Sequence, residues 1–316
     1  MEKYYKEEYD LLKKQKYHVI GHHSAIKKCR WTHNSLVKGQ PCYKEKFYGI
    51  KSHRCLQMSP SVIWCTNNCL FCWRISSKDS SFPFNDEKMI DDPDFILDRC
   101  YYEWKRILSG YKPTSHSKVS WEKWNDAQNP FSIAISLSGE PTLYPRLNEL
   151  IEASFKRGLK VFLVSNGTRP DVIRSLHPPS QLYISVSAPT EDIYRKTCRP
   201  AFKKNWNNLK ESLEYLRSFK TPTAIRLTLV KNLNMIKPDE YAKMILKAEP
   251  TYIECKGYVN VRTSRKYLTF SDMPFHDEVK EFAKKISEYT GYNIIDEHPP
   301  SRVVLLSKLK KPIRFD

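Results

Sequence analysis

The spacing of apolar residues indicates strands and helices that alternate from residue 61 to residue 256. Apolar runs of strand length predict strands at 61–64, 131–137, 160–164, 181–187, 222–231 and 251–256. Apolar residues at helical spacing predict helices at 92–110, 145–157, 170–177, within 191–219 and at 238–248. Short strands separated by helices are typical of βαβ units, so we expect an α/β fold with a parallel sheet.

Six such units fit a partial (β/α)6 barrel of the TIM type, whose functional groups gather at the C-terminal ends of the strands. A helix near 3–16 and a mostly irregular segment precede this barrel. We therefore expect three parts, namely an N-terminal extension (1–58), the barrel core (59–256) and a C-terminal extension (257–316).

The C-terminal extension begins with a loop at 257–274 that is long for a compact domain and carries Tyr258, Arg262, Arg265, Lys266 and Tyr267. Long loops of this kind tend to be functional, so we interpret it as a loop that grips the substrate, although a plain surface loop remains possible. A helix at 275–290 and strands at 292–296 and 301–307 follow, and the strands should extend or cover an open sheet edge.

Charge points to a polyanionic partner. The chain of 316 residues has 53 Lys and Arg against 35 Asp and Glu, a formal net charge of +18. Nucleic acid is the usual partner of such an excess, and an ordinary basic enzyme is the alternative. No apolar run approaches the roughly 20 residues that span a bilayer, so we expect a cytoplasmic protein without a membrane partner.

Six of the nine cysteines fall between positions 29 and 72, and three of them form the pattern C-x3-C-x2-C at Cys65, Cys69 and Cys72. Three thiolates on one short loop can hold three irons of a cubane cluster and leave the fourth iron open. Structural zinc usually takes four protein ligands, and a ferredoxin cluster needs a fourth cysteine. The triplet resembles that of the radical S-adenosylmethionine (SAM) superfamily, with structural zinc as the alternative.

Another triplet, the first along the chain, is formed by Cys29, Cys42 and Cys55, each 13 residues from the next. Basic residues flank all three, and positive charge stabilises thiolates and an anionic cluster. The triplet therefore indicates a second cluster, and three separate structural cysteines are the alternative.

Small and polar residues follow three of the predicted strands, where a SAM molecule would bind. A glycine lets the backbone approach a ligand, and a carboxylate can accept a hydrogen bond from the SAM ammonium group. The candidate SAM-binding residues are Gly139, Glu140, Pro141, Thr142, Asn166, Gly167 and Ser187. Arg226, within the strand at 222–231, either meets a carboxylate inside the barrel or makes an outward salt bridge.

Taken together, these motifs resemble the archaeal-type tRNA 4-demethylwyosine synthases of the radical SAM superfamily. The resemblance covers nearly the whole chain and rests on the two triplets, on the stretch Cys42–Ile50, on Ser138–Thr142 and on Ile294–His298. It implies a carbon–carbon lyase that adds a two-carbon unit of pyruvate to N1-methylguanosine beside the anticodon of tRNA-Phe.

The resemblance also implies cofactors and roles. Cys65, Cys69 and Cys72 would hold the 4Fe–4S cluster that binds SAM, and Cys29, Cys42 and Cys55 would hold a second 4Fe–4S cluster that binds pyruvate. Lys44 would form a Schiff base with pyruvate or, alternatively, would only neutralise the cluster or RNA. We expect a monomer that receives electrons from a separate donor protein.

Two other functions remain open. A different radical SAM enzyme would consume SAM but ignore pyruvate. A zinc-dependent RNA-binding module would bind zinc and never cleave SAM.

Overall fold

The structure is a computed structural model that describes residues 5–76 and 86–316, and its chain forms two compact units. Unit 1 comprises residues 1–65, 75–163 and 314–316, and unit 2 comprises residues 66–74 and 164–313. Among the helices of the described residues, none combines the length and apolar character needed to span a membrane.

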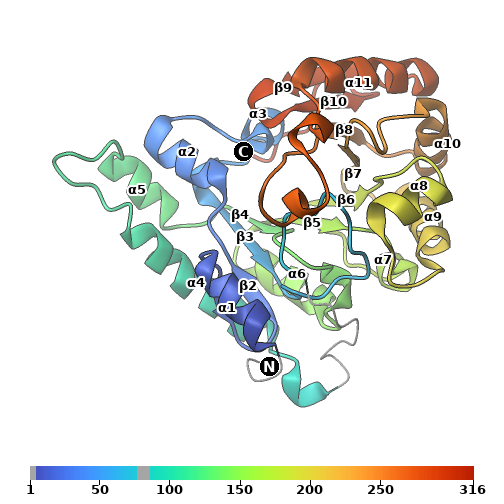
Figure 1. Cartoon of the computed structure of the whole chain (residues 1–316). Helices are drawn as coiled ribbons and strands as arrows, with labels where there is room; N and C mark the ends of the chain where they lie inside the picture. Colours follow the sequence, from blue (N-terminus) through green and yellow to red (C-terminus); the bar gives the residue numbers. More distant parts are fainter. Residues whose placement is uncertain (1–4, 77–85) are drawn as a thin grey trace. The chain divides into compact units, whose positions relative to one another are not determined.

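Unit 1 contains the N-terminal elements and the first parallel strands (Figure 1). Its elements are α1 (Lys6–Lys14), β1 (His18–Ile20), β2 (Ser24–Ile26), α2 (Arg30–Lys38), α3 (Tyr43–Tyr48), η1 (Ser52–Arg54), β3 (Cys55–Ser59), η3 (Glu87–Met89), α4 (Pro93–Ser109), α5 (Trp121–Ala127), β4 (Ser132–Ile135), η4 (Pro141–Leu143), α6 (Leu147–Lys156) and most of β5 (Lys160–Ser165). Strands β3, β4 and β5 are parallel, whereas β1 and β2 add to β3 in antiparallel fashion.

Unit 2 continues the alternation of strands and helices. Its elements are α7 (Pro170–Arg174), β6 (Gln181–Ser185), α8 (Glu191–Cys198), α9 (Asn205–Leu216), β7 (Thr223–Leu229), α10 (Pro238–Ala248), β8 (Tyr252–Gly257), η5 (Arg262–Lys266), η6 (Phe270–Asp272), α11 (His276–Thr290), β9 (Asn293–His298), η7 (Pro299–Ser301) and β10 (Val303–Ser307). Strands β6, β7 and β8 are parallel, and β10 and β9 extend the sheet beyond β8 in antiparallel fashion, as predicted.

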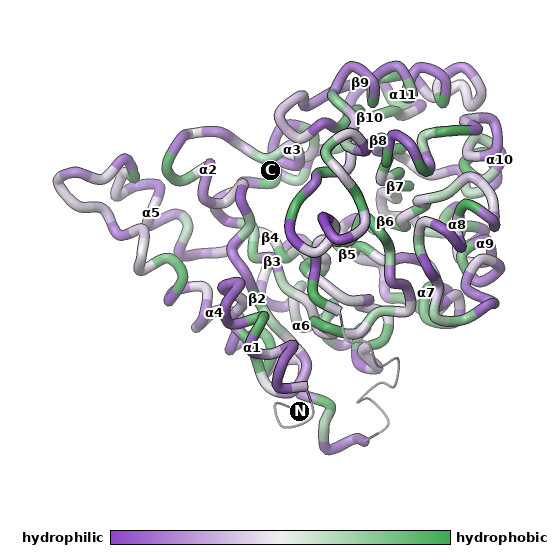
Figure 2. The backbone as a smooth tube through the Cα atoms, viewed as in Figure 1, coloured by the Kyte–Doolittle hydropathy of each residue, from purple (hydrophilic) through white to green (hydrophobic). Residues whose placement is uncertain are grey.

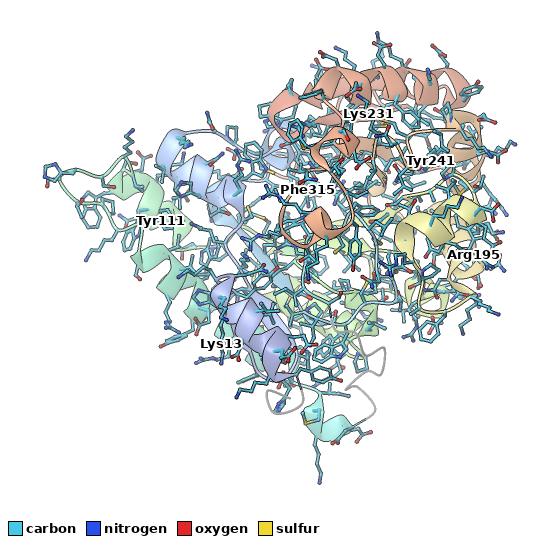
Figure 3. All side chains as sticks on the ribbon, in the orientation of Figure 1. Lys13, Tyr111, Arg195, Lys231, Tyr241 and Phe315 are labelled. Carbon is cyan, nitrogen blue, oxygen red and sulfur yellow. The ribbon has the colours of Figure 1, made fainter. Side chains whose placement is uncertain are left out.

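Helix α11 shows how an amphipathic sequence covers this sheet. Its residues alternate between hydrophilic and hydrophobic along the helix (Figure 2), and the buried ones include Val279, Phe282 and Ile286. Phe282 packs edge-to-face on Tyr241 of α10, which is labelled in Figure 3, with 6.0 Å between the ring centroids. The apolar stripe therefore fixes α11 against its neighbour, while its charged residues face solvent.

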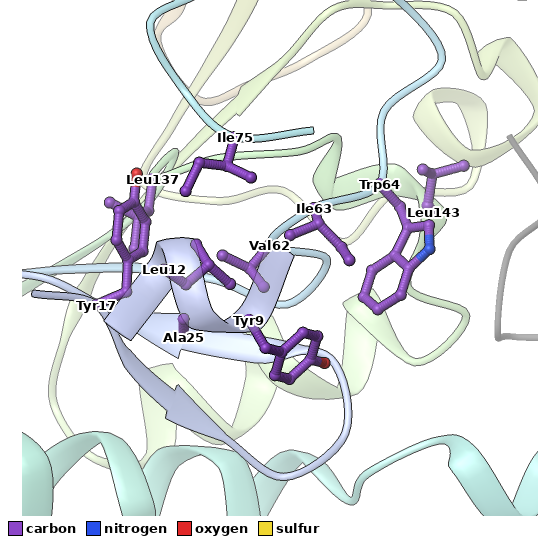
Figure 4. Packing of buried hydrophobic residues seen from close by; sticks show 10 residues of the cluster. All are labelled: Tyr9, Leu12, Tyr17, Ala25, Val62, Ile63, Trp64, Ile75, Leu137 and Leu143. Atoms are coloured by element: carbon purple, nitrogen blue, oxygen red, sulfur yellow. The ribbon is translucent and has the colours of Figure 1, made fainter. Parts of the chain in front are cut away.

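Strand β3 ends earlier than the sequence suggested. The strand predicted at 61–64 is wrong, because β3 spans Cys55–Ser59 and residues 61–64 form a turn. Val62, Ile63 and Trp64 are buried there against Tyr9 and Leu12 of α1 and their neighbours (Figure 4). An apolar run of four residues can fill a core as a turn or as a strand, and its pattern does not distinguish the two.

The expectation of a mostly irregular N-terminal segment is also wrong. Helices α2 and α3 and strands β1 and β2 lie between residues 18 and 48. The predicted helix near 3–16 corresponds to α1, and its first two predicted residues lie outside the described part of the chain. The division of the chain at residues 58 and 256 stays a prediction.

Candidate active site

Cys29, Cys42 and Cys55 lie at the starts of three elements of unit 1. Cys29 is the N-cap of α2, and its Sγ accepts a hydrogen bond from the backbone N–H of Thr32 at 3.3 Å. Cys42 is the N-cap of α3, and Cys55 is the first residue of β3. Helix N-termini and strand ends expose few competing side chains, so the thiols remain partly accessible, and all three are half-buried.

The three thiols are close enough to influence one another. Burial and, to a smaller extent, a charge on Cys29 raise the pKa of the Cys42 thiol to about 12, while the Lys44 ammonium opposes the rise. Burial and Cys29 likewise raise the pKa of Cys55, again opposed by Lys44. A metal binds thiolates, so a cluster must displace the protons of Cys42 and Cys55 on binding.

Lys44 faces the same thiols from the first turn of α3. Its ammonium acts on the pKa of both Cys42 and Cys55. Its side-chain nitrogen also lies 4.8 Å from the ring centroid of Phe162 on β5. The structure thus brings Lys44 close to two thiols of the first triplet.

Hydrogen bonds through Ser52 hold the backbone of Cys42 in place. The sequence did not reveal them. The Cys42 backbone N–H donates to Ser52 Oγ at 2.7 Å. The Ser52 hydroxyl and backbone N–H in turn donate to Glu45 Oε2 at 2.6 and 2.8 Å. Glu45 and Ser52 therefore fix the start of α3 against η1.

Cysteine thiolates are the usual protein ligands of iron–sulfur clusters, and a cubane cluster binds each cysteine through a different iron. Three half-buried thiols beside a lysine fit an anionic cluster with one open iron.

The second triplet is divided between the units. Cys69 and Cys72 lie on the loop 66–74 of unit 2, and Cys65 is the residue that precedes this loop in the chain. The Cys72 backbone N–H donates to the Cys69 carbonyl at 3.0 Å, which closes a turn between the two thiols. Burial and Cys69 raise the pKa of Cys72 to about 11.

Cys198, the last residue of α8, contacts this loop although the sequence gave it no role. A thiol hydrogen bond with Cys198, together with burial, raises the pKa of Cys69 well above its ordinary value. The Cys198 carbonyl also accepts from the Asn68 N–H at 3.0 Å. Cys198 is buried, as are Cys100 and Cys255.

The predicted SAM contact Asn166 holds the same loop in place. Its Nδ2 donates to Thr66 Oγ1 at 2.8 Å, and its Oδ1 accepts from the Thr168 hydroxyl at 2.7 Å. Thr66 and Thr168 also share a hydrogen bond of 2.6 Å. Asn205 of α9 adds a bond from its Nδ2 to the Thr66 carbonyl at 2.9 Å. The strand end after β5 therefore positions the cysteine loop.

Gly167 and Ser187, two other candidate SAM-binding residues, also make contacts within the fold. Gly167 has φ +71°, and a Cβ there would lie 2.8 Å from Leu209 of α9, so only glycine lets the helix approach. The Ser187 carbonyl accepts from Asn234 Nδ2 at 2.7 Å.

The turn Ser138–Thr142 packs on the chain just before Cys65. Gly139 has φ +68°, and a Cβ there would lie 1.8 Å from the Ser61 carbonyl oxygen. The Glu140 N–H donates to the Trp64 carbonyl at 2.8 Å, and Glu140 is 2% exposed. Its Oε1 accepts from the Thr142 hydroxyl at 2.8 Å and caps η4, which begins at Pro141. The close approach needs glycine, and it holds the carboxylate in a fixed orientation.

Arg226 pairs with a buried carboxylate. This agrees with the first of the two alternatives for Arg226, a contact with a carboxylate rather than an outward salt bridge. Its Nε lies 3.0 Å from Glu254 Oε2, and the Glu254 side chain is fully buried. The guanidinium also lies 4.5 Å from the ring centroid of Tyr183 on β6. A buried, charge-assisted pair of this kind favours one fixed arrangement of β6, β7 and β8.

Two family models match the chain. The model of the radical SAM superfamily matches residues 60–245, and the model described as wyosine base formation matches residues 247–308.

Proteins of similar sequence and structure carry names from the same family. The S-adenosyl-L-methionine-dependent tRNA 4-demethylwyosine synthase of Pyrococcus horikoshii is 44% identical over 308 residues, which are 96% of this chain and 89% of that protein. A structure of TYW1 with a lysine–pyruvate adduct bound matches with a TM-score of 0.87 and 39% identity, covering 97% of both chains. The crystal structure of archaeal TYW1 matches with a TM-score of 0.80 and 35% identity, covering 98% of this chain and 99% of that one.

These structures confirm the predicted radical SAM fold, a partial barrel, and the identities confirm the family that the motifs indicated. The chain belongs to the SAM-dependent tRNA 4-demethylwyosine synthases.

Proposed function

We propose that this enzyme joins a two-carbon unit of pyruvate to N1-methylguanosine beside the anticodon of tRNA-Phe. The observation that carries the proposal is the position of Lys44, a half-buried amine whose charge reaches the thiols of Cys42 and Cys55. The lysine–pyruvate adduct bound in the similar TYW1 structure supports the same substrate here.

In this proposal Lys44 binds pyruvate covalently. Its unprotonated amine attacks the keto carbon of pyruvate, a C–N bond forms, and the keto oxygen leaves as water. The amine lies against the Phe162 ring, which limits the directions from which pyruvate approaches. Holding the two reactants in one orientation is a large part of what the protein contributes.

Two sets of cysteines would hold the cofactors. Cys29, Cys42 and Cys55 would hold one 4Fe–4S cluster, and Cys65, Cys69 and Cys72 would hold the other. When bound, the clusters and SAM supply the electron and radical chemistry that activates the N-methyl group of the substrate. Glu45 and Ser52 keep Cys42 in position, and Thr66, Asn166 and Thr168 keep the second loop in position.

The proposed SAM-binding residues are Gly139, Glu140, Pro141, Thr142, Asn166, Gly167 and Ser187. Glu140 is the proposed acceptor for the SAM ammonium group because its carboxylate is buried and oriented by Thr142. The glycines contribute by letting the backbone approach closely, rather than through side-chain contacts.

The net charge of +18 supports tRNA as the macromolecular substrate. Basic residues of the N-terminal segment and of the 257–274 loop are the proposed phosphate contacts. A separate protein is the proposed electron donor, and the enzyme is proposed to be a monomer that works in the cytoplasm.

Anaerobic incubation tests the proposal. The reconstituted enzyme is mixed with N1-methylated tRNA-Phe, SAM, a reductant and labelled pyruvate, and label in the tRNA is measured. We expect incorporation by the unaltered enzyme and none by the Lys44→Met variant. The Lys105→Met variant is the matched control, because Lys105 is an exposed lysine of α4 outside the proposed tRNA contacts.

The outcomes separate the possible functions. Deoxyadenosine without label in the tRNA would indicate a radical SAM enzyme that does not use pyruvate. Incorporation by Lys44→Met equal to that of the unaltered enzyme would exclude the covalent role of Lys44.

A further inference from the structure

The cysteine loop 66–74 of unit 2 is held on one side by the residues that follow α8. The Asn68 N–H donates to the Arg199 carbonyl at 3.2 Å, and the Ala201 N–H donates to the Thr66 carbonyl at 3.0 Å. Arg199 itself has φ +45°, a left-handed conformation that few non-glycine residues adopt. The contacts with the loop therefore fix the place where the Arg199 side chain begins.

The same loop also packs on the long segment after β8. Leu70 and Phe71 of the loop contact a buried group that includes Tyr258, Leu268 and Met273. Two segments that are far apart in the sequence, 199–204 and 258–273, thus both contact the loop that carries Cys69 and Cys72.

Arg199 and Tyr267 meet across these two segments. The Arg199 guanidinium lies 5.2 Å from the ring centroid of Tyr267, and Tyr267 is 48% exposed. The Tyr267 backbone is anchored, because its N–H donates to the carbonyl of the buried Ser264 at 3.0 Å. An aromatic ring and a guanidinium group are therefore presented to solvent from rigid backbone.

The surroundings of this pair are basic. Segment 199–204 contains Arg199, Lys203 and Lys204, segment 262–267 contains Arg262, Arg265 and Lys266, and neither segment contains a carboxylate. Phe202 and Phe270 are also exposed, at 42% and 64%. Cations interleaved with exposed rings are typical of surfaces that bind single-stranded nucleic acid.

We propose that Arg199 and Tyr267 form a stacking platform for one unpaired base of the tRNA anticodon loop, next to the nucleotide that is modified. The inference rests on the proposed function, because it assigns a binding site for the proposed tRNA substrate. Planar guanidinium and phenol groups stack on bases of any sequence, and the neighbouring lysines and arginines bind phosphates. The platform adjoins the loop of Cys69 and Cys72, to which the substrate methyl group must come close.

Equilibrium binding of tRNA-Phe and of its anticodon stem-loop tests this site without requiring turnover. We expect Tyr267→Ala to weaken binding about 10-fold, in line with the contribution of one stacked base. Tyr267→Phe keeps the ring and should bind within about twofold of the unaltered enzyme. Arg199→Lys keeps the positive charge but removes the planar guanidinium group, so it should also weaken tRNA binding.

Salt dependence distinguishes stacking from phosphate contacts. Tyr267→Ala removes no charge, so the slope of log Kd against log salt concentration should stay the same. Lys203→Ala should instead make the slope shallower, by up to about one unit. Replacing each unpaired loop nucleotide in turn by an abasic one should reveal one position at which Tyr267→Ala has no further effect.

The matched control is Tyr289→Ala, because Tyr289 is an exposed tyrosine (54%) on α11 of the same unit. Iron content and melting temperature of each variant show that it is folded. Normal affinity in both Tyr267→Ala and Arg199→Lys would overturn the platform. Failure of the unaltered enzyme to bind tRNA would overturn the proposed function instead.

Discussion

The side-chain nitrogen of Lys44 lies 4.8 Å from the ring centroid of Phe162, and that ring is itself held by Phe315. The Phe162 and Phe315 rings pack edge-to-face with 5.3 Å between their centroids. The Phe315 N–H donates to the carbonyl of Tyr48, the last residue of α3, at 2.9 Å. Residues from positions 44, 162 and 315 therefore combine to orient one amine beside the first cysteine triplet.

Replacing Phe162 by leucine should impair the capture of pyruvate by Lys44. Leucine fills most of the buried space but offers no ring face on which the Lys44 amine can rest, so the amine loses its orientation toward pyruvate. We expect the Michaelis constant for pyruvate to rise by up to about 100-fold, with iron content and SAM cleavage without tRNA unchanged. Borohydride trapping followed by mass spectrometry measures the adduct directly.

The control for this variant is Phe155→Leu, because Phe155 is an exposed phenylalanine of α6 in the same unit. An unchanged pyruvate dependence in Phe162→Leu would show that the ring does not orient Lys44. Phe315→Leu should give a smaller effect in the same direction, since it acts through Phe162.

The two cysteine triplets predict the iron content of the reconstituted protein. Two 4Fe–4S clusters correspond to about eight irons per chain, and alanine at Cys29, Cys42 and Cys55 together should leave about four. Cys100→Ala should keep about eight, because Cys100 is buried on α4 and belongs to neither triplet. Eight irons in the triple variant would exclude the first triplet as a cluster site.

The sequence predicted most of the strands and located the cysteine motif because both are local patterns. Strands β5 and β6 contain continuous apolar runs, at 161–164 and 182–184, of the kind that a doubly covered sheet needs. The pattern Cys65, Cys69 and Cys72 is likewise contained in eight consecutive residues, so it is recognised from its spacing.

Other features depend on contacts between distant residues and could not be predicted. Helix α2 begins at a cysteine N-cap, whereas Ser, Thr, Asp and Asn are the usual signals. The bond between Asn166 and Thr66 joins residues 100 positions apart, and nothing in either segment signals it. The contact of Cys198 with Cys69 and the pairing of Arg199 with Tyr267 are equally non-local.

Gly139→Ala should disrupt the turn that carries Glu140. Gly139 and Gly158 both have positive φ, +68° and +73°, so alanine is strained by about 1–2 kcal/mol at either position. Only at Gly139 would the new Cβ collide, at 1.8 Å from the Ser61 carbonyl oxygen, whereas at Gly158 no atom lies within 4 Å.

We therefore expect Gly139→Ala to lower the free energy of unfolding by several kcal/mol more than Gly158→Ala and to weaken SAM binding. Denaturant unfolding and equilibrium binding of SAM measure the two effects. Equal losses in the two variants would mean that the turn can move away from residues 61–64 without cost.

The carboxylate of Glu103 should make the stability of unit 1 depend on pH. Glu103 is 4% exposed on α4, and it bonds His18 Nδ1 at 2.6 Å and Arg106 at 2.9 Å. Burial by itself raises the pKa of Glu103, but the hydrogen bonds from His18 and Arg106 outweigh it and hold the pKa below its ordinary value. Because the folded protein binds this proton less tightly, the ionised carboxylate stabilises the fold above the pKa of the unfolded chain.

Glu103→Gln should accordingly lower the free energy of unfolding at pH 7 by about 1.5–3 kcal/mol, the contribution of hydrogen bonds to a charged group. The difference from the unaltered protein should shrink as the pH falls through the depressed pKa, because Glu103 then becomes protonated as well. Glu122→Gln, at an exposed position of α5, should change stability little at any pH. Denaturant titrations from pH 8 down to about pH 2 measure these differences, and a Glu103→Gln penalty that stays constant down to the lowest pH would show that packing rather than charge accounts for the loss.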